Sequence, residues 1–268
     1  WLYDDGYHED GGANDGVFCE RYPGVDLPGV YQIKAIGGGD ANDGRAFVRR
    51  AMGYTTREPK VLYVYEDKAT AQEYQELFAL NTIQADLVPV DELKPGSPDL
   101  SQYALIVIGP ATGHLNDWGT PDALDALVEN RRPTLGLGEG GYAFYGQLYL
   151  YIGYPYGWHG QDRDVYAVDL AHVVWQAPHD LKLSKPEVNL YGATNHVGIH
   201  IEETPPWGVE LLGREVDDQY HYPIIRQVTW QWGDEPWNHC LWGYGAGPSS
   251  MTDQGMRLFF NTAWYMMH

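Results

Sequence analysis

The pattern of hydrophobic and polar positions divides the chain near residue 60. Residues 1–60 are rich in Asp, Gly and Asn and show no regular hydrophobic period. Beyond them, short apolar runs alternate with amphipathic stretches, and the runs predict buried strands at 61–65, 85–90, 104–108, 134–138 and 240–244. We therefore expect an acidic N-terminal extension, residues 1–60, packed on the core, and one α/β domain, residues 61–268.

Helices are predicted between these strands. Amphipathic stretches indicate helices at 70–80 and 120–130, from 142, and from about 250 onward. Thr120 and Pro121 are a typical helix start, and 250–253 has capping-box spacing. Strands that alternate with helices predict a three-layer flavodoxin-like doubly wound sheet, mostly parallel. Alternating stretches at 196–202 and 224–232 predict antiparallel insertions in the second half.

Charge narrows the possible partners. The chain has 17 Lys+Arg against 37 Asp+Glu, a net charge of −20, which argues against binding to nucleic acid or to an anionic membrane surface. No apolar run is long enough to insert into a membrane. The 10 Trp and 21 Tyr are typical of surfaces that meet wet ligands or partners. Together with few Lys and many Asp and Gly, they favour an extracellular or cell-surface protein.

The most informative stretch is the glycine-rich turn after the fourth predicted strand, Gly136-Leu137-Gly138-Glu139-Gly140. A strand enters this turn and a helix leaves it, so backbone N–H groups at the helix start can receive an anion. In open α/β sheets, ligands bind at this carboxyl edge, where Gly109 also ends a strand.

This turn resembles the elbow of the class I glutamine amidotransferase-like superfamily, Gly-x-Cys-x-Gly. The resemblance covers roughly residues 60–150 and 239–267. It puts the nucleophilic Cys on Gly138, and no His-x-Glu follows the last core strand, where 241–247 reads Leu-Trp-Gly-Tyr-Gly-Ala-Gly. Residues 136–160 are also similar to an uncharacterised branch of bacterial extracellular proteins that commonly lacks the nucleophile. The resemblance therefore implies a catalytically degenerate domain.

Other residues near the turn could bind a ligand. Glu139, a carboxylate at a helix N-terminus, suits a hydroxyl or a cation, or else holds the turn through neighbouring N–H groups. His159 could reach the same edge or bond its own loop, and these two are the candidate catalytic residues. Flat aromatic side chains beside carboxylates suit sugars, and a partner protein would use the same residues. The predicted ligand-binding residues are Gly109, Gly138, Glu139, Gly140, Tyr142, Tyr154, Tyr156 and Trp158.

Two groups could bind metal ions. On a strand, His196, His200 and Glu202 would share one face. They could bind a transition metal, form a polar outer face, or act as a base with its orienting partner. In the N-terminal segment, the carboxylates of Asp10, Asp15, Asp40 and Asp43 either bind calcium or form solvated turns. No organic cofactor is expected.

The two cysteines, Cys19 and Cys240, could pair in an oxidising compartment or remain separate buried thiols. The sequence thus predicts a secreted or cell-surface binding or structural module that recognises a protein partner or a glycan. The alternative is a hydrolase of a different mechanism, carbohydrate-active or metal-assisted, that uses Glu139 and nearby His.

Overall fold

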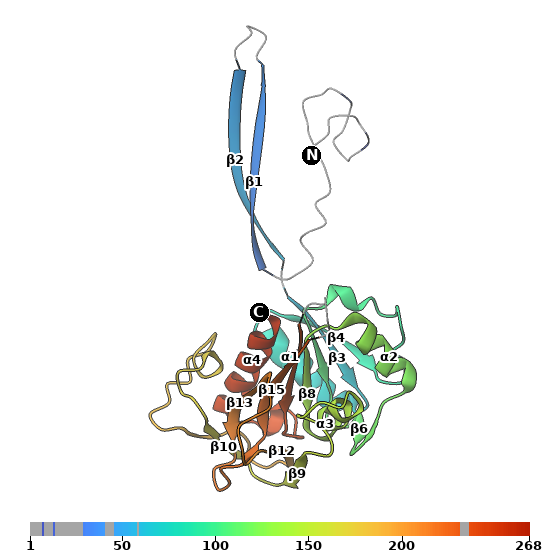
Figure 1. Cartoon of the computed structure of the whole chain (residues 1–268), viewed down its shortest axis with the longest axis vertical. Helices are drawn as coiled ribbons and strands as arrows, with labels where there is room; N and C mark the ends of the chain where they lie inside the picture. Colours follow the sequence, from blue (N-terminus) through green and yellow to red (C-terminus); the bar gives the residue numbers. More distant parts are fainter. Residues whose placement is uncertain (1–6, 8–12, 14–28, 41–45, 58, 231–235) are drawn as a thin grey trace. The chain divides into compact units, whose positions relative to one another are not determined.

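The computed structural model describes residues 7, 13, 29–40, 46–57, 59–230 and 236–268. The chain divides into two units, Trp1–Glu58 and Pro59–His268. In the first, β1 (Gly29–Asp40) pairs with β2 (Ala46–Arg57) as an antiparallel hairpin (Figure 1). The expected packing of the N-terminal extension on the α/β domain stays a prediction. Among the described helices, none is both long and apolar enough to cross a membrane.

A parallel half-sheet forms the centre of the second unit. In spatial order its strands are β16 (Trp237–Trp242), β8 (Thr134–Leu137), β5 (Leu105–Ile108), β3 (Lys60–Tyr65) and β4 (Gln84–Pro89). Ranked by their place in the chain and read from β4, they follow the order 2-1-3-4-5. That is the flavodoxin-like doubly wound order, so the predicted fold class is confirmed.

Antiparallel strands extend the sheet beyond β16. They are β15 (Ile224–Thr229), β13 (Val209–Arg214), β10 (Asp164–Ala167) and β11 (Glu187–Asn189). A separate three-stranded sheet contains β14 (His221–Tyr222), β12 (His196–His200) and β9 (Gly157–Gly160), and a small hairpin contains β6 (Gly113–His114) and β7 (Asp117–Trp118). The two predicted antiparallel segments are strands, and they lie in different sheets.

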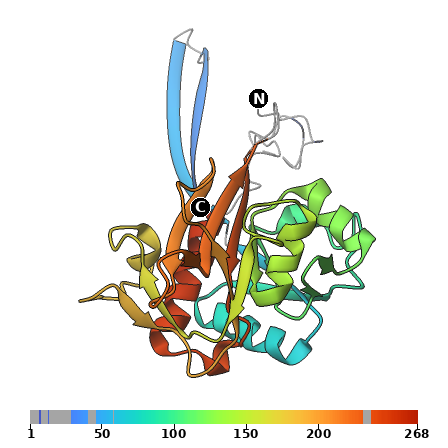
Figure 2. The ribbon, with the colours of Figure 1, turned by 60° about the horizontal axis from the view of Figure 1, so that its bottom comes forward.

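Helices cover both faces of the parallel strands because the strand side chains alternate. Tyr63 points into a core shared with α1 (Lys68–Leu80) and α4 (Asp253–Met267). Leu62 and Val64 point into a second core shared with α2 (Pro121–Asn130) and α3 (Gly138–Gln147). Figure 2 shows α2 and α3, in green, grouped apart from α1 and α4, in cyan and red. Short helical turns lie at Leu100–Gln102, Val173–Trp175 and Pro248–Ser250.

Two helix starts differ from the sequence prediction. The third long helix begins at Gly138, directly after β8, and not near Tyr142. Low intrinsic propensity of the glycines hid this start, while close packing of Gly141 on Gly136 favours it. The last helix is capped by Thr252, whose hydroxyl accepts a hydrogen bond from Gly255 N–H at 3.0 Å, and not by Ser250.

Candidate functional site

The turn from β8 into α3 places Gly138 at the carboxyl edge of the sheet. Gly138 has a φ of +47°, in the left-handed region that disfavours side chains. A Cβ added there would lie 2.9 Å from Cα of Gly245 and 3.2 Å from Cβ of Pro110. The position to which the resemblance assigns a nucleophile therefore has neither a side chain nor room for one.

The neighbouring glycines pack the strand ends against the helix. A Cβ on Gly140 would overlap the carbonyl oxygen of Gly109, and the N–H of Gly109 donates to the carbonyl of Val64 at 2.8 Å. Gly140 N–H in turn donates to the carbonyl of Pro110 at 2.9 Å. Gly109 and Gly140, both predicted to contact ligand, thus hold α3 against β5.

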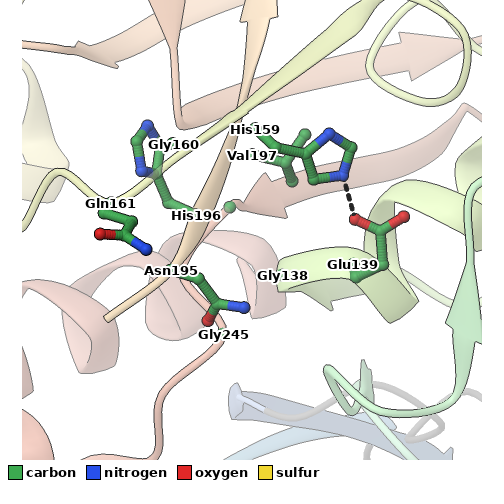
Figure 3. A pocket seen from close by; sticks show the side chains of 10 residues that line it. Gly138, Glu139, His159, Gly160, Gln161, Asn195, His196, Val197 and Gly245 are labelled. Atoms are coloured by element: carbon green, nitrogen blue, oxygen red, sulfur yellow. Dashed lines mark hydrogen bonds and ion pairs between the residues drawn. The ribbon is translucent and has the colours of Figure 1, made fainter. Parts of the chain in front are cut away.

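A pocket of about 310 Å³ lies above Gly138 (Figure 3). Its glycine positions expose backbone, and its polar walls come from α3, β9 and the segment before β12. Figure 3 shows Glu139 and His159 facing each other, with Gln161 and Asn195 elsewhere on the wall. The lining residues are Gly138, Glu139, His159, Gly160, Gln161, Asn195, His196, Val197, Gly243 and Gly245.

Glu139 accepts two hydrogen bonds and contacts a third polar group. One oxygen accepts the Leu115 N–H at 2.6 Å and lies 3.3 Å from Nδ1 of His114; the other lies 2.5 Å from Nε2 of His159. Leu115 has a φ of +53° in the tight turn between β6 and β7, which aims its N–H at the carboxylate. Because a carboxylate only accepts, Nε2 of His159 carries a proton, and Nδ1 is free to act as an acceptor in the neutral ring.

A second carboxylate–histidine group lies beside the pocket. His196 is buried, and its Nε2 lies 2.6 Å from Oε1 of Glu215. Burial alone would raise the pKa of Glu215, but the hydrogen bonds that His196 and His221 donate to its carboxylate outweigh burial and hold that pKa below its usual value. Burial and the charge of Glu215 raise the pKa of Asp162.

The predicted set His196, His200 and Glu202 does not share one ligand position. His196 bonds Glu215, whereas Nε2 of His200 lies 3.1 Å from Oε1 of Glu202. Ligand atoms converge in two other groups within the described part of the chain: Asp162, His196 and Glu215, and Glu215, Asp218 and His221. Both histidines lie on β12 four residues apart, as the alternation predicts.

His196 is poorly suited to bind a metal in this arrangement. Its Nδ1 accepts the Asp162 N–H at 3.1 Å, so its proton is on Nε2, which donates to Glu215. A metal ion bound to Nε2 would displace this proton. Since Nδ1 is already an acceptor and carries no proton, the ring would have to become an imidazolate anion. His196 therefore serves to orient the pocket wall.

The aromatic residues divide between core and surface. Tyr142 is buried, and its hydroxyl accepts a hydrogen bond from Gly157 N–H at 3.0 Å. Tyr154 is partly buried and Tyr156 stacks on Tyr151 with ring centroids 4.5 Å apart. Trp158, on β9, is 63% exposed. Trp158 and Tyr156 thus provide exposed aromatic surface next in sequence to the pocket residue His159.

A second pocket lies at the carboxyl ends of β3, β4 and β5. Its volume is about 590 Å³, and its acidic lining includes Glu66, Asp91 and Asp117. It lies where the strand order reverses, which is the usual ligand position in doubly wound sheets. His114 lines this pocket and lies 3.3 Å from Glu139 of the first, so the two pockets lie on either side of one histidine–carboxylate contact.

Several residues of the site were not predicted from the sequence. They are His114, Gln161, Asn195, Glu215 and His221, which come from loops and short strands without a local motif. Among the residues that line the pocket, the sequence predicted Gly138, Glu139 and His159 at the ligand site and His196 only as a metal ligand. Asp10, Asp15, Asp43 and Cys19 lie outside the described residues, as does the side chain of Asp40, so calcium stays a prediction. Cys240 is a free thiol, which contradicts its expected disulfide and agrees with the other alternative, a separate buried thiol. Cys240 is buried in β16, and burial raises the pKa of its thiol.

Comparison with known proteins gives one family match, confined to the N-terminal part. Residues 1–55 match the model of the conditioned medium factor second Ig-like domain. No curated protein matches the chain.

Several solved structures share similarity with the chain at low sequence identity. A GMP synthase subunit of Thermoplasma acidophilum is 11% identical with a TM-score of 0.44, covering 79% of this chain and 96% of that one. A Thermotoga maritima glutamine amidotransferase is 12% identical with a TM-score of 0.41, covering 63% and 71%. The carbohydrate deacetylase Agd3 is 11% identical with a TM-score of 0.48, covering 78% and 32%. The strand order, not these likenesses, identifies the fold.

Proposed function

We propose that this chain is a degenerate glutamine amidotransferase-like domain that binds a polyhydroxylated ligand, a glycan, non-covalently in the pocket above Gly138. The observation that carries the proposal is the contrast between the bottom and the walls of this pocket. Gly138 stands where a nucleophile would act, with the Gly245 backbone 2.9 Å from any added Cβ, whereas the walls carry polar side chains.

The chemistry of the walls suits sugar hydroxyls. Glu139 offers carboxylate oxygens that the hydrogen bonds from Leu115 and His159 already orient, and Gln161 and Asn195 each offer a donor and an acceptor. Trp158, next to His159 on β9, points to the opposite face of that strand and does not line the pocket, so the pocket recognises its ligand through the polar groups of its walls. A protein partner, the other ligand class expected from the sequence, would require a broader apolar surface than this small pocket offers.

Covalent amide chemistry is disfavoured by the same geometry. A thiolate mechanism needs a nucleophile and a base within hydrogen-bond reach. Gly138 cannot supply the first. The segment after β16, where the resemblance would place the base, contributes Gly243 and Gly245 to the pocket.

A second candidate function rests on the Glu139–His159 pair. At 2.5 Å, the carboxylate fixes the tautomer of a half-exposed histidine and leaves Nδ1 as an acceptor. A histidine oriented in this way can take a proton from water, as a hydrolase of a non-covalent mechanism requires. This candidate differs from the first in requiring turnover.

Binding to a glycan array, followed by calorimetry on the best glycan, tests the proposal. We expect Glu139→Gln and Asn195→Ala to weaken binding about tenfold or more, because each removes a wall group. Glu203→Gln, an exposed glutamate outside the pocket, should bind like the unchanged protein. No glycan binding, or equal binding by all variants, would reject the proposal.

A turnover assay on the bound glycans separates the two candidates. Product formation that His159→Ala abolishes would establish the hydrolase and overturn the binding module. Binding with unchanged glycan supports the module.

We also propose that the domain works outside the cell or at its surface. The net charge of −20 and the Tyr/Trp-rich composition support this location. Antibody detection in medium and surface fractions of the source cells tests it, and exclusive detection in the cytosol would reject it.

A further inference from the structure

One face of the small sheet β9–β12–β14 carries several histidines. His200 on β12 lies directly opposite His221 on β14, and their ring centroids are 5.2 Å apart. Trp158 on β9 covers this face, with its ring 6.0 Å from His200 and 5.9 Å from His221. The two imidazoles therefore share one partly covered site beside, but outside, the lining of the glycan pocket.

Each of these histidines is oriented by carboxylates on one side. Nε2 of His200 lies 3.1 Å from Oε1 of Glu202. Nδ1 of His221 lies 3.4 Å from Oε2 of Glu215 and 3.8 Å from Oδ2 of Asp218. These carboxylates accept, so the facing nitrogens carry the ring protons, and the second nitrogen of each neutral ring presents a lone pair.

Those second nitrogens have no partner in the described part of the chain. Nδ1 of His200 and Nε2 of His221 are both buried and both lack a hydrogen-bond partner there. Buried acceptors without partners are costly, and histidines whose other N–H donates to a carboxylate are the usual arrangement of metal ligands. Two such rings side by side on paired strands require an explanation beyond packing.

We propose that Nδ1 of His200 and Nε2 of His221 bind one divalent transition metal ion, zinc or copper(II). Two imidazoles bound to a tetrahedral ion at about 2.0–2.1 Å place their ring centres about 5 Å apart. The observed separation is 5.2 Å. Imidazole nitrogen suits these ions, and water would complete the coordination. This site is independent of the proposed glycan binding.

The proposal revises the metal set expected from sequence. His196 is excluded because both its nitrogens are engaged, by Asp162 N–H and by Glu215. Glu202 becomes an orienting residue and not a ligand, because it faces the protonated nitrogen of His200. His221, which lies on β14, takes the place of His196 and Glu202 as the second metal ligand beside His200.

Calorimetric titration of the full chain with zinc tests the site. His200→Ala removes one ligand, and His221→Asn removes the other while its amide can still donate to Glu215. Each should weaken zinc binding at this site at least tenfold. His172→Gln is the matched control: His172 also lies 3.1 Å from a carboxylate, on Glu210, but its Nδ1 already accepts the Val174 N–H.

Copper(II) quenching of tryptophan fluorescence gives a second readout. Because Trp158 lies about 6 Å from both rings, a bound ion should quench its emission. We expect the quenchable fraction to fall in Trp158→Phe and in both histidine variants, and to persist in His172→Gln. The proposal would be overturned if all variants bind zinc with equal affinity, or if the affinity depends on only one of the two histidines. It would also be overturned if the protein without substitutions binds no zinc.

Discussion

Substitution of Gly138 by Ala tests whether the elbow excludes any side chain. Gly96 provides a matched comparison, because it also has a positive φ, +77°, while no described atom lies within 4 Å of a Cβ added to it. Gly138 has a φ of +47°, and a Cβ added there meets a backbone atom, Cα of Gly245, at 2.9 Å. Both substitutions strain the backbone, and only Gly138→Ala adds a steric conflict.

The expected magnitudes follow from these two terms. Placing Ala in the left-handed region costs about 1 kcal/mol, so Gly96→Ala should lower the free energy of unfolding by about that amount. At Gly138 the conflict with a neighbouring backbone adds roughly 1–3 kcal/mol, as for overpacked cores. Gly138→Ala should therefore lose about 2–4 kcal/mol in total. For a domain of 150–250 residues, this corresponds to a melting temperature lower by roughly 4–16 °C.

Urea unfolding followed by tryptophan fluorescence measures both variants under the same conditions. The slope against urea should stay unchanged, so the midpoints alone report the difference in stability. If Gly138→Ala loses no more stability than Gly96→Ala, the elbow has room for a side chain. The argument against a nucleophile at this position would then fail.

Two further substitutions probe the scaffold. Tyr145→Phe removes a buried hydroxyl that donates to the carbonyl of Cys240 at 2.8 Å. In urea titrations this should lower the free energy of unfolding by about 2–4 kcal/mol. Tyr149→Phe is the control, because Tyr149 is 94% exposed, and it should leave the free energy of unfolding unchanged. The hydrogen bond from His172 outweighs burial and lowers the pKa of Glu210 to about 2 from 4.5. The folded-state pKa of Glu210 lies below its unfolded value, so the ionised carboxylate stabilises the folded state. This contribution to the free energy of unfolding is complete above about pH 4.5 and is lost as the pH falls through about 2. Glu210→Gln should therefore lower the free energy of unfolding by roughly 1 kcal/mol at pH 6, after allowance for solvent exposure, and should not change it near pH 2. A difference between the variant and the unchanged protein that stays constant as the pH is lowered would contradict this reasoning.

The parallel core could be predicted because its signals are local. Each buried strand is an apolar run, and Thr120 with Pro121 marks the start of α2 unambiguously. The start of α3 was missed because Gly138, Gly140 and Gly141 are poor helix formers, and close tertiary packing overrides that propensity. Two-residue strands such as β6, β7 and β14 are too short to show any period.

The site was predictable only where its residues adjoin a recognisable turn. Glu139 follows the elbow directly, and His159 was close enough in sequence to be considered. His114 reaches Glu139 through a hairpin 25 residues earlier in the chain, and no pattern links His221 to His200 before the strands pair. Strand alternation correctly placed His200 on a face, but the partner on that face depends on the sheet order, which a single sequence does not encode locally.

The elbow geometry has a structural cause that is separate from catalysis. Gly140 fits against the Gly109 carbonyl, and the Tyr145 hydroxyl accepts the Gly136 N–H at 2.8 Å, so β5, β8 and α3 fix the turn without any contribution from a side chain at Gly138. A strained position at a sheet edge is therefore not evidence of a nucleophile by itself. What indicates function is the set of groups around it that packing does not require: the oriented carboxylate of Glu139 and the polar side chains that share its pocket.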